Sequence, residues 1–273
     1  MKRHFLLFCG IFSLWGCAKN PVLPTESQVV VQAYLYDHEE VSDIFIGRSN
    51  SIGSTDSTNQ PITTAVVTLQ KNGTTYGLIA DPARAGYYLY TGIDLTVATG
   101  DKFSLQVVAD GTTATAETVV PEKPSGVSMS QSVVTFATDT ITTPRGTMTR
   151  VVLQDTVDIQ WSNTTDDLFY VVIRSVDSAR TLVSTDSMRA FPARSFVSSP
   201  TTASRYRLSE SELKYTGRYT AHVYHVNKEY ADLYKSREQD SRDMTEPLTN
   251  VTNGLGVFSA FASDTVSFVV VKE

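Results

Sequence analysis

Both cysteines of the chain, Cys9 and Cys17, lie near its amino terminus, so any thiol chemistry belongs to this segment. Lys2 and Arg3 precede an apolar run from Phe5 to Trp15, and Gly16 then precedes Cys17. This order is that of a secretory signal peptide closed by a lipobox. The run is about eleven residues long, whereas a membrane-spanning helix needs about 20. We therefore predict that residues 1–16 are removed and that the Cys17 thiol is lipidated.

The predicted lipid anchor has consequences for the compartment. Cys9 falls in the removed segment and Cys17 carries the thioether, so the mature chain has no thiol for catalysis and forms no disulfide. Each buried acyl methylene contributes about 0.8 kcal/mol, so the several chains of a mature lipoprotein hold it firmly. Residue 18 is alanine and not aspartate, which by analogy with lipoprotein sorting favours the cell outer membrane. Whether the protein faces the periplasm or the cell surface stays open.

Three histidines and two acidic groups are the candidates for metal chemistry. His222 and His225 lie three apart in a predicted strand, so their side chains point to opposite faces, and with His38 they are interpreted as separate histidines. Asp166-Asp167 and the pair Asp240 and Asp243 lack the spacing and the glycine of a calcium loop. We predict solvated turn carboxylates there, and no metal and no cofactor.

Catalytic motifs give no positive signal. The sequence has no Gly-x-Ser-x-Gly elbow, no His-Glu-x-x-His and no phosphate-binding glycine loop. A non-enzymatic protein is therefore expected, while a hydrolase built from scattered Ser, His and Asp remains an alternative. The net charge moves from −6 to −8 when Lys2 and Arg3 are removed, and no basic cluster remains. This balance argues against a nucleic-acid partner.

The mature chain is predicted to be all-β, with two antiparallel β-sandwich domains in tandem. Residues 17–27 form a lipidated, proline-containing tether. Residues 28–121 are rich in β-branched and aromatic residues, and Asn72-Gly73 and Asp110-Gly111 predict tight hairpins. The pattern is typical of an immunoglobulin-like or transthyretin-like sandwich. The strands expected are 29–36, 41–46, 64–69, 75–80, 86–90, 103–108 and 112–120.

The clearest break is the Pro-rich and Gly-containing segment 121–126, where we place the domain boundary. Residues 122–273 are expected to form a second, fibronectin-III-like sandwich. The only helix is predicted at 227–239, with Asn227 as its cap. The last two strands, 256–261 and 266–271, are predicted to form a hairpin through Ser263-Asp264. Exposed tyrosines of 86–90 and of the helix are an alternative platform for carbohydrate or a partner.

A motif close to the carboxyl terminus carries a family resemblance. Its residues are Glu246 and Pro247, then Thr249-Asn250-Val251, then Asn253-Gly254-Leu255-Gly256-Val257-Phe258. The order resembles that of the domain-of-unknown-function 4249 family, lipoproteins of the Bacteroidota cell envelope. The Tyr-rich helix, the strand that begins with Val29-Val30-Val31, Ala65-x-Val67-x-Leu69 and Gly86-x-Tyr88 match it in order as well. Asn253 replaces a common glycine, and Asn tolerates positive φ best after glycine.

The resemblance implies a function class and not a chemistry. Members of this family are often encoded beside TonB-dependent outer-membrane transporters. We therefore expect a non-enzymatic outer-membrane lipoprotein that is an accessory or binding partner of such a transporter; the alternative is a structural or adhesive surface module. Asp-Ser motifs resembling the O-glycosylation signal of this phylum make Ser57 and Ser187 candidate glycosylation sites.

Overall fold

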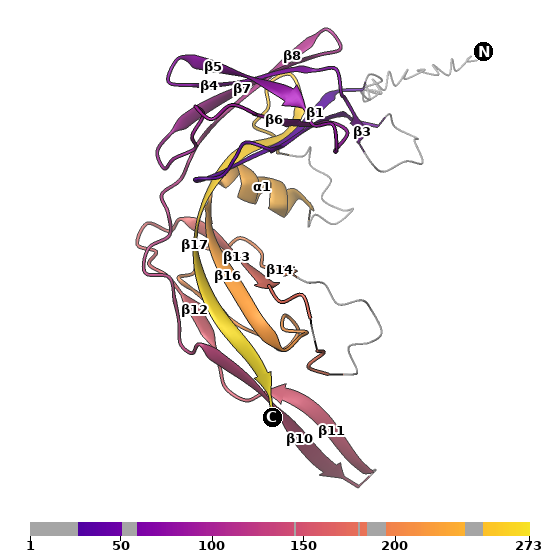
Figure 1. Ribbon diagram of the computed structural model, residues 1–273, viewed down its shortest axis with the longest axis vertical. Helices are drawn as coiled ribbons and strands as arrows, with labels where there is room; N and C mark the ends of the chain where they lie inside the picture. Colours follow the sequence, from indigo (N-terminus) through magenta and orange to yellow (C-terminus); the bar gives the residue numbers. More distant parts are fainter. Residues whose placement is uncertain (1–26, 51–58, 145, 180, 185–194, 238–247) are drawn as a thin grey trace, which may run out of the picture.

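The computed structural model describes residues 27–50, 59–144, 146–179, 181–184, 195–237 and 248–273. Figure 1 shows a long, curved molecule with a β-sandwich towards each end and a short helix, α1 (Lys228–Arg237), on one side of their junction. The prediction of an all-β protein of two sandwiches with one short helix is confirmed. The helix lies within the predicted span 227–239, of which 238 and 239 fall outside the described residues.

The first sandwich contains the predicted hairpins. Both residues of Asn72-Gly73 and of Asp110-Gly111 have positive φ, as a two-residue hairpin turn of matching twist requires. The side chains of Leu69, Phe103 and Leu105 alternate inward and form part of its core. Its strands are β1 (Val29–Tyr36), β2 (Asp43–Arg48), β3 (Gln60–Pro61), β4 (Val66–Lys71), β5 (Thr74–Ala80), β6 (Tyr87–Leu89), β7 (Lys102–Ala109) and β8 (Thr112–Val119).

The second sandwich packs a larger sheet against a three-stranded sheet of order β15-β12-β9. Phe136, Trp161, Tyr219 and Phe268 are buried between them. The hairpin of β10 and β11 extends beyond this core, at the lower end of Figure 1. The strands are β9 (Ser128–Met129), β10 (Val133–Thr143), β11 (Gly146–Leu153), β12 (Asp158–Gln160), β13 (Leu168–Ser175), β14 (Ser195–Val197), β15 (Arg205–Arg207) and β16 (Gly217–Val226).

The last strand, β17 (Leu255–Lys272), belongs to both sandwiches. It pairs in parallel with β1 from Leu255 to Phe261, and antiparallel with β16 from Phe261 to Val270. The predicted hairpin through Ser263-Asp264 is therefore wrong: these two residues lie inside a single continuous strand of 18 residues. The pairing with β16 explains this, because Tyr224 and Val223 of β16 lie opposite Ser263 and Asp264, and a turn would break these backbone hydrogen bonds.

The predicted domain boundary needs a correction for the same reason. Residues 28–121 and 122–273 were expected to be consecutive and separate domains. However, Val251, Phe258 and Ala260 are buried in the core of the first sandwich, while Phe268 and Val270 lie in that of the second. The alternating apolar residues of one long strand thus serve two cores, which fixes the two sandwiches to each other.

Candidate functional site

The family motif builds the start of β17. The side-chain amide of Asn250 forms two hydrogen bonds with the backbone of Phe258. Nδ2 donates to the carbonyl oxygen at 2.7 Å, and Oδ1 accepts from the backbone nitrogen at 2.9 Å. Thr249 Oγ1 donates to the Gly256 carbonyl at 2.8 Å. These bonds satisfy strand-edge groups that would otherwise lack partners in a partly buried place. The motif thus closes a loop and is not itself a cleft.

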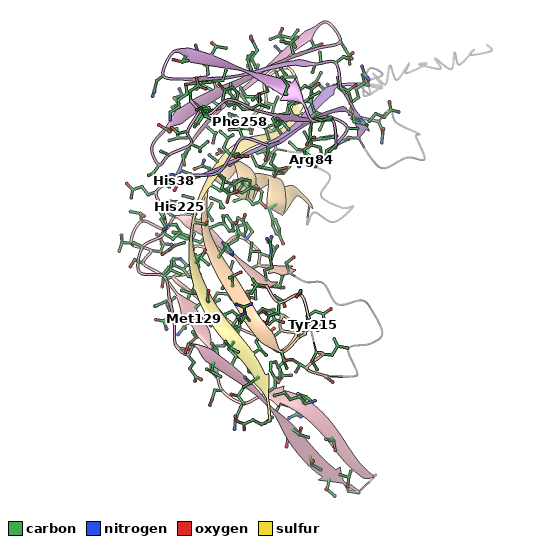
Figure 2. All side chains as sticks on the ribbon, viewed as in Figure 1. His38, Arg84, Met129, Tyr215, His225 and Phe258 are labelled. Atoms are coloured by element: carbon green, nitrogen blue, oxygen red, sulfur yellow. The ribbon has the colours of Figure 1, made fainter. Side chains whose placement is uncertain are left out.

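Two further motif residues are needed for close backbone approach. Asn253 has φ 57°, the positive value expected from its identity. Gly256 has φ 105°, and a Cβ placed there would lie 1.9 Å from the Val31 carbonyl oxygen. A Cβ at Gly254 would lie 3.0 Å from the Val29 carbonyl. Phe258, labelled in Figure 2, is fully buried in the first sandwich. The described motif residues therefore have structural roles.

Several predicted sites lie outside the described residues: Cys17, Ser57, Ser187, Asp240, Asp243, Glu246 and Pro247. The three histidines are not brought together. His222 Nδ1 lies 3.0 Å from Thr265 Oγ1, whereas His225 Nδ1 lies 2.7 Å from the Glu122 carbonyl and its ring stacks on Phe169. Among the described residues, no group of three or more His, Cys, Asp or Glu side chains has the arrangement of a metal site.

Asp166 and Asp167 occupy a turn, as predicted. Asp166 has φ 56°, and the backbone nitrogen of Asp167 donates to Asn163 Oδ1 at 3.1 Å. The hydroxyl of Thr165 donates to the Asp167 carboxylate at 2.5 Å. The same carboxylate also lies 3.8 Å from His225 Nε2, so it is used within its own loop and towards β16.

The residues that do converge are aromatic, and they lie at the junction of the sandwiches. We call them the junction cluster: Tyr34 and Tyr36 of β1, Tyr170 of β13, Tyr224 of β16, Tyr230 of α1 and Phe261 of β17. Phe261 is at the centre, with ring centroids 4.9 Å from Tyr230, 5.2 Å from Tyr36 and 5.7 Å from Tyr34. The cluster draws on both sandwiches and on the helix.

A cavity of about 130 Å³ opens within the junction cluster. The cluster supplies four tyrosines and Phe261, and the remaining lining residues are Asp43, Leu233 and Tyr234. The Tyr36 hydroxyl donates to Asp43 Oδ2 at 3.4 Å. We call this cavity the junction pocket. It combines apolar ring surface with a few polar groups, which is the usual make-up of a small-molecule site.

Helix α1 forms one wall of the pocket, and polar bonds to the first sandwich hold it there. Glu229, in the first turn of the helix, accepts from the hydroxyls of Thr118 at 2.9 Å and Ser259 at 3.3 Å. Asn227 Nδ2 donates to the Val119 carbonyl at 2.8 Å. The amide of Asn227, predicted to cap the helix, thus bonds the helix entrance to β8. A carboxylate in the first helical turn also suits the helix dipole.

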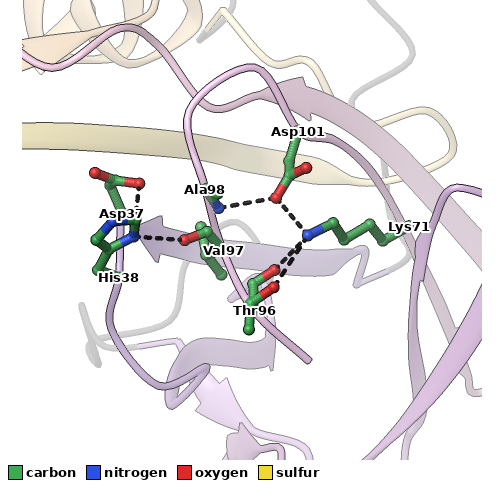
Figure 3. Close-up of polar contacts among 7 residues, drawn as sticks. All are labelled: Asp37, His38, Lys71, Thr96, Val97, Ala98 and Asp101. Carbon is green, nitrogen blue, oxygen red and sulfur yellow. Dashed lines mark hydrogen bonds and ion pairs between the residues drawn. The ribbon is translucent and has the colours of Figure 1, made fainter. Parts of the chain in front are cut away.

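Polar contacts also hold the residues that follow β1, and Figure 3 shows those around Val97 and Lys71. The backbone nitrogen of Asp37 donates to the Phe261 carbonyl at 2.8 Å, and that of His38 donates to the Val97 carbonyl at 2.9 Å. The loop containing Val97 is held by Lys71, whose Nζ lies 2.5 Å from Asp101 Oδ2 and 2.7 Å from the Thr96 carbonyl. This network fixes the strand end that carries Tyr36.

Electrostatics keep the tyrosine rings neutral. Burial, and to a lesser extent the nearby Asp43 carboxylate, raises the pKa of Tyr36 far above its ordinary value. Burial likewise raises the pKa of Tyr170 and, more modestly, that of Tyr224. Asp43 is the only ionisable group other than tyrosine on the described pocket wall.

A larger hollow lies on the outer face of β4, β7 and β8. It measures about 690 Å³ and is lined mostly by threonine, glutamine and serine side chains, together with Glu117 and Asn250. It carries no aromatic side chain in the described lining. Since the junction pocket has aromatic ring surface supplied by both sandwiches and the helix, it is the stronger candidate.

Sequence reasoning missed the junction pocket, although it identified several of its residues. The tyrosines of the helix were considered as a possible platform for a ligand or partner, and the spacing of Tyr34 and Tyr36 places both on one face of β1. What links β1 to the helix is the crossing of β17, and local periodicity carries no signal for that contact.

No described helix is long and apolar enough to cross a membrane.

Comparisons with known proteins add a family and distant structural likenesses. No curated protein matches the chain. The FN1–FN3 domains of chicken CNTN1 are 12% identical, with 89% of this chain and 66% of that chain covered and a TM-score of 0.26. Titin domains A168–A170 are 13% identical, with 90% and 66% covered and a TM-score of 0.21.

The chain thus spans 66% of the length of both solved structures. The family described as domain of unknown function DUF4249 matches residues 19–267, which is nearly the whole chain. The protein therefore belongs to the DUF4249 family.

Proposed function

We propose that this protein is a non-enzymatic lipoprotein of the bacterial outer membrane, anchored through Cys17, that serves as an accessory binding partner of a TonB-dependent transporter. The observation that carries the binding role is the junction pocket, because two sandwiches and a helix converge there on one small aromatic cavity. Its lining offers ring faces, hydroxyls and one carboxylate, which suits recognition better than bond-breaking chemistry. The transporter is proposed from the resemblance to envelope lipoproteins stated above.

The partner proposal is tested by capture from the native membrane. Cells expressing a tagged protein are cross-linked, solubilised in detergent and analysed by mass spectrometry. A TonB-dependent transporter should be enriched with the wild-type protein, relative to cells carrying an unrelated tagged lipoprotein. Recovery of the tagged protein alone, in repeated experiments at several cross-linker lengths, would overturn the transporter partnership.

The anchor is tested separately. Cys17→Ala should abolish labelling by an acyl-chain probe and move the protein to the soluble fraction, because the thioether acceptor is lost. Cys9→Ala is the matched control, since the signal is expected to function without that thiol. If the Cys17→Ala protein stays in the membrane fraction after a carbonate wash, the predicted lipid anchor is wrong.

A structural or adhesive surface module is the second candidate, and one feature favours it. The β10–β11 hairpin extends past the second core, and Thr138, Thr140, Thr147 and Thr149 on it are exposed. An adhesin must be accessible on intact cells, whereas an accessory protein can work from the periplasmic side. Protease shaving of intact cells separates the two: loss of the protein without cell lysis supports surface display, and full protection rules out adhesion.

A further inference from the structure

The aromatic rings that line the junction pocket stand at steep angles to one another. The ring planes of Tyr230 and Phe261 meet at 85°, those of Tyr34 and Tyr230 at 83°, and those of Tyr34 and Phe261 at 60°. Such an arrangement does not form a flat platform on which a sugar ring or a planar base could stack. It surrounds a compact group instead, as the aromatic cages that bind quaternary ammonium groups do.

The charges around the pocket favour a cation. Asp43 lines it, and Glu39 lies close enough to raise the pKa of Tyr224. Of the basic residues nearby, Arg84 lies close enough to Asp43 for their charges to interact, but it is outside the pocket lining. Arg84 is bound through Nε to Asp81 Oδ2 at 2.7 Å and through a terminal nitrogen to the Ser42 carbonyl at 2.5 Å. Arg174 acts on Tyr224 and His222 from beside the cluster and is not part of the pocket wall.

The neutral state of the rings supports the same ligand class. Because burial raises the pKa values of Tyr36 and Tyr170, both stay protonated and keep the negative ring face that attracts a cation. An anionic ligand would meet the Asp43 carboxylate and find no cation on the described wall.

Size selects a small head group. A cavity of about 150 Å³ takes one benzene molecule, and the junction pocket measures about 130 Å³. A methylated ammonium group is compact, weakly hydrated and of this size class, whereas a whole sugar ring with its hydroxyls needs more room and more hydrogen-bond partners. We propose that the junction pocket binds a small, free quaternary ammonium compound of the choline class, held by the tyrosine and phenylalanine rings and by Asp43. This inference rests on the proposed binding role of the pocket and names its ligand.

The test compares choline with its neutral carbon isostere, 3,3-dimethyl-1-butanol, on the full lipidated protein in a maltoside detergent. Ligand-observed proton NMR measures both affinity and environment, because ring currents shift the methyl protons of an enclosed trimethylammonium group upfield. Choline is expected to bind at least about tenfold more tightly than the isostere, in line with a desolvated cation–π contact. Equal affinity for the two probes, or binding without the upfield shift, overturns the proposal.

Two aspartate variants locate the charge. Asp43→Asn keeps shape and hydrogen bonding, and it should weaken choline binding about tenfold while leaving the isostere unchanged. Asp232→Asn is the matched control, because Asp232 lies on α1 but outside the pocket lining, paired with Lys228. An equal loss in both variants means that only the diffuse charge of the protein attracts choline, and this overturns the assigned site. Tyr230→Leu should reduce the upfield shift, because it removes one of the rings that line the pocket.

The experiment also separates this inference from the proposed function. If choline does not bind but the transporter is still captured, the ligand assignment fails and the partnership stands. If choline binds and no transporter is captured, the ligand assignment stands and the transporter partnership fails. A third probe, Nα-acetyl-lysine amide, represents a lysine side chain of a partner protein. Tighter binding of this probe than of choline would overturn the free-ligand proposal in favour of a docking contact.

Discussion

The motif loop, residues 249–258, and the junction cluster lie at opposite ends of the same contact between β1 and β17, yet they use their side chains differently. In the motif loop, the side chains of Asn250 and Thr249 form hydrogen bonds with backbone groups of β17. In the junction cluster, partly exposed tyrosine rings surround a cavity. The residues by which the family is recognised therefore build the scaffold, and the candidate site is formed by residues that the motif does not include.

The largest expected effect comes from Gly256→Ala in the motif loop. The new Cβ would meet the Val31 carbonyl oxygen at 1.9 Å, and the residue would keep a φ of 105°. Overpacking and backbone strain together should cost about 4 kcal/mol of unfolding free energy. Urea denaturation followed by circular dichroism measures the change.

Gly73→Ala is the matched control for Gly256→Ala. Its φ is 82°, but nothing lies within 4 Å of the added Cβ, so only backbone strain remains, at about 1 kcal/mol. Similar losses for both variants would show that the close approach of β1 and β17 is relaxed in solution.

The next effect is expected from Asn250→Ala. Removing the amide leaves both the N–H and the carbonyl of Phe258 without the partner they have in the fold, which should cost about 2 kcal/mol. Thermal unfolding of the full chain is the measurement. Asn253→Gly serves as comparison and should stay within about 0.5 kcal/mol of wild type, because glycine accepts φ 57° readily. If Asn250→Ala left the stability unchanged, the scaffold role of the motif would be contradicted.

Changes in the junction cluster should affect stability less than ligand binding. Tyr230→Leu keeps apolar volume next to Phe261 and loses the edge-to-face ring contact, at about 1 kcal/mol. Its binding of choline should fall much further than this stability loss suggests. Chemical denaturation and NMR titration of the same preparation give both numbers. Should stability fall by as much as in Asn250→Ala, the cluster is as much scaffold as the motif loop.

The smallest effect is a pH dependence at the second sandwich. Burial, with a smaller contribution from Arg174, lowers the pKa of His222 below its ordinary value. The unfolded chain then binds the proton more readily than the folded one. The stability that neutral His222 contributes is therefore present above the unfolded pKa and is lost as the pH falls through the folded pKa. The free energy of unfolding should fall between pH 8 and pH 5, and it should fall less steeply in His222→Gln. An unchanged slope would remove His222 as its source.

Local chemistry predicted the turns and the conformation of the motif. Asn72-Gly73, Asp110-Gly111 and Asn253 have the positive φ values that their residue types indicate, because these choices depend only on a few neighbouring atoms. The course of β17 was missed for the opposite reason. Ser263-Asp264 has the composition of a turn, and only pairing with β16, about 40 positions earlier in the chain, holds it extended.

The parallel pairing of β1 with β17 also decides how the molecule responds to a pull. The register joins seven residue pairs, from Val30 with Leu255 to Tyr36 with Phe261. Force applied at residue 28 acts backwards along β1, while resistance from the second sandwich acts forwards along β17. The ladder is therefore sheared along its length, so that its hydrogen bonds must yield together and not one after another as in an unzipping hairpin.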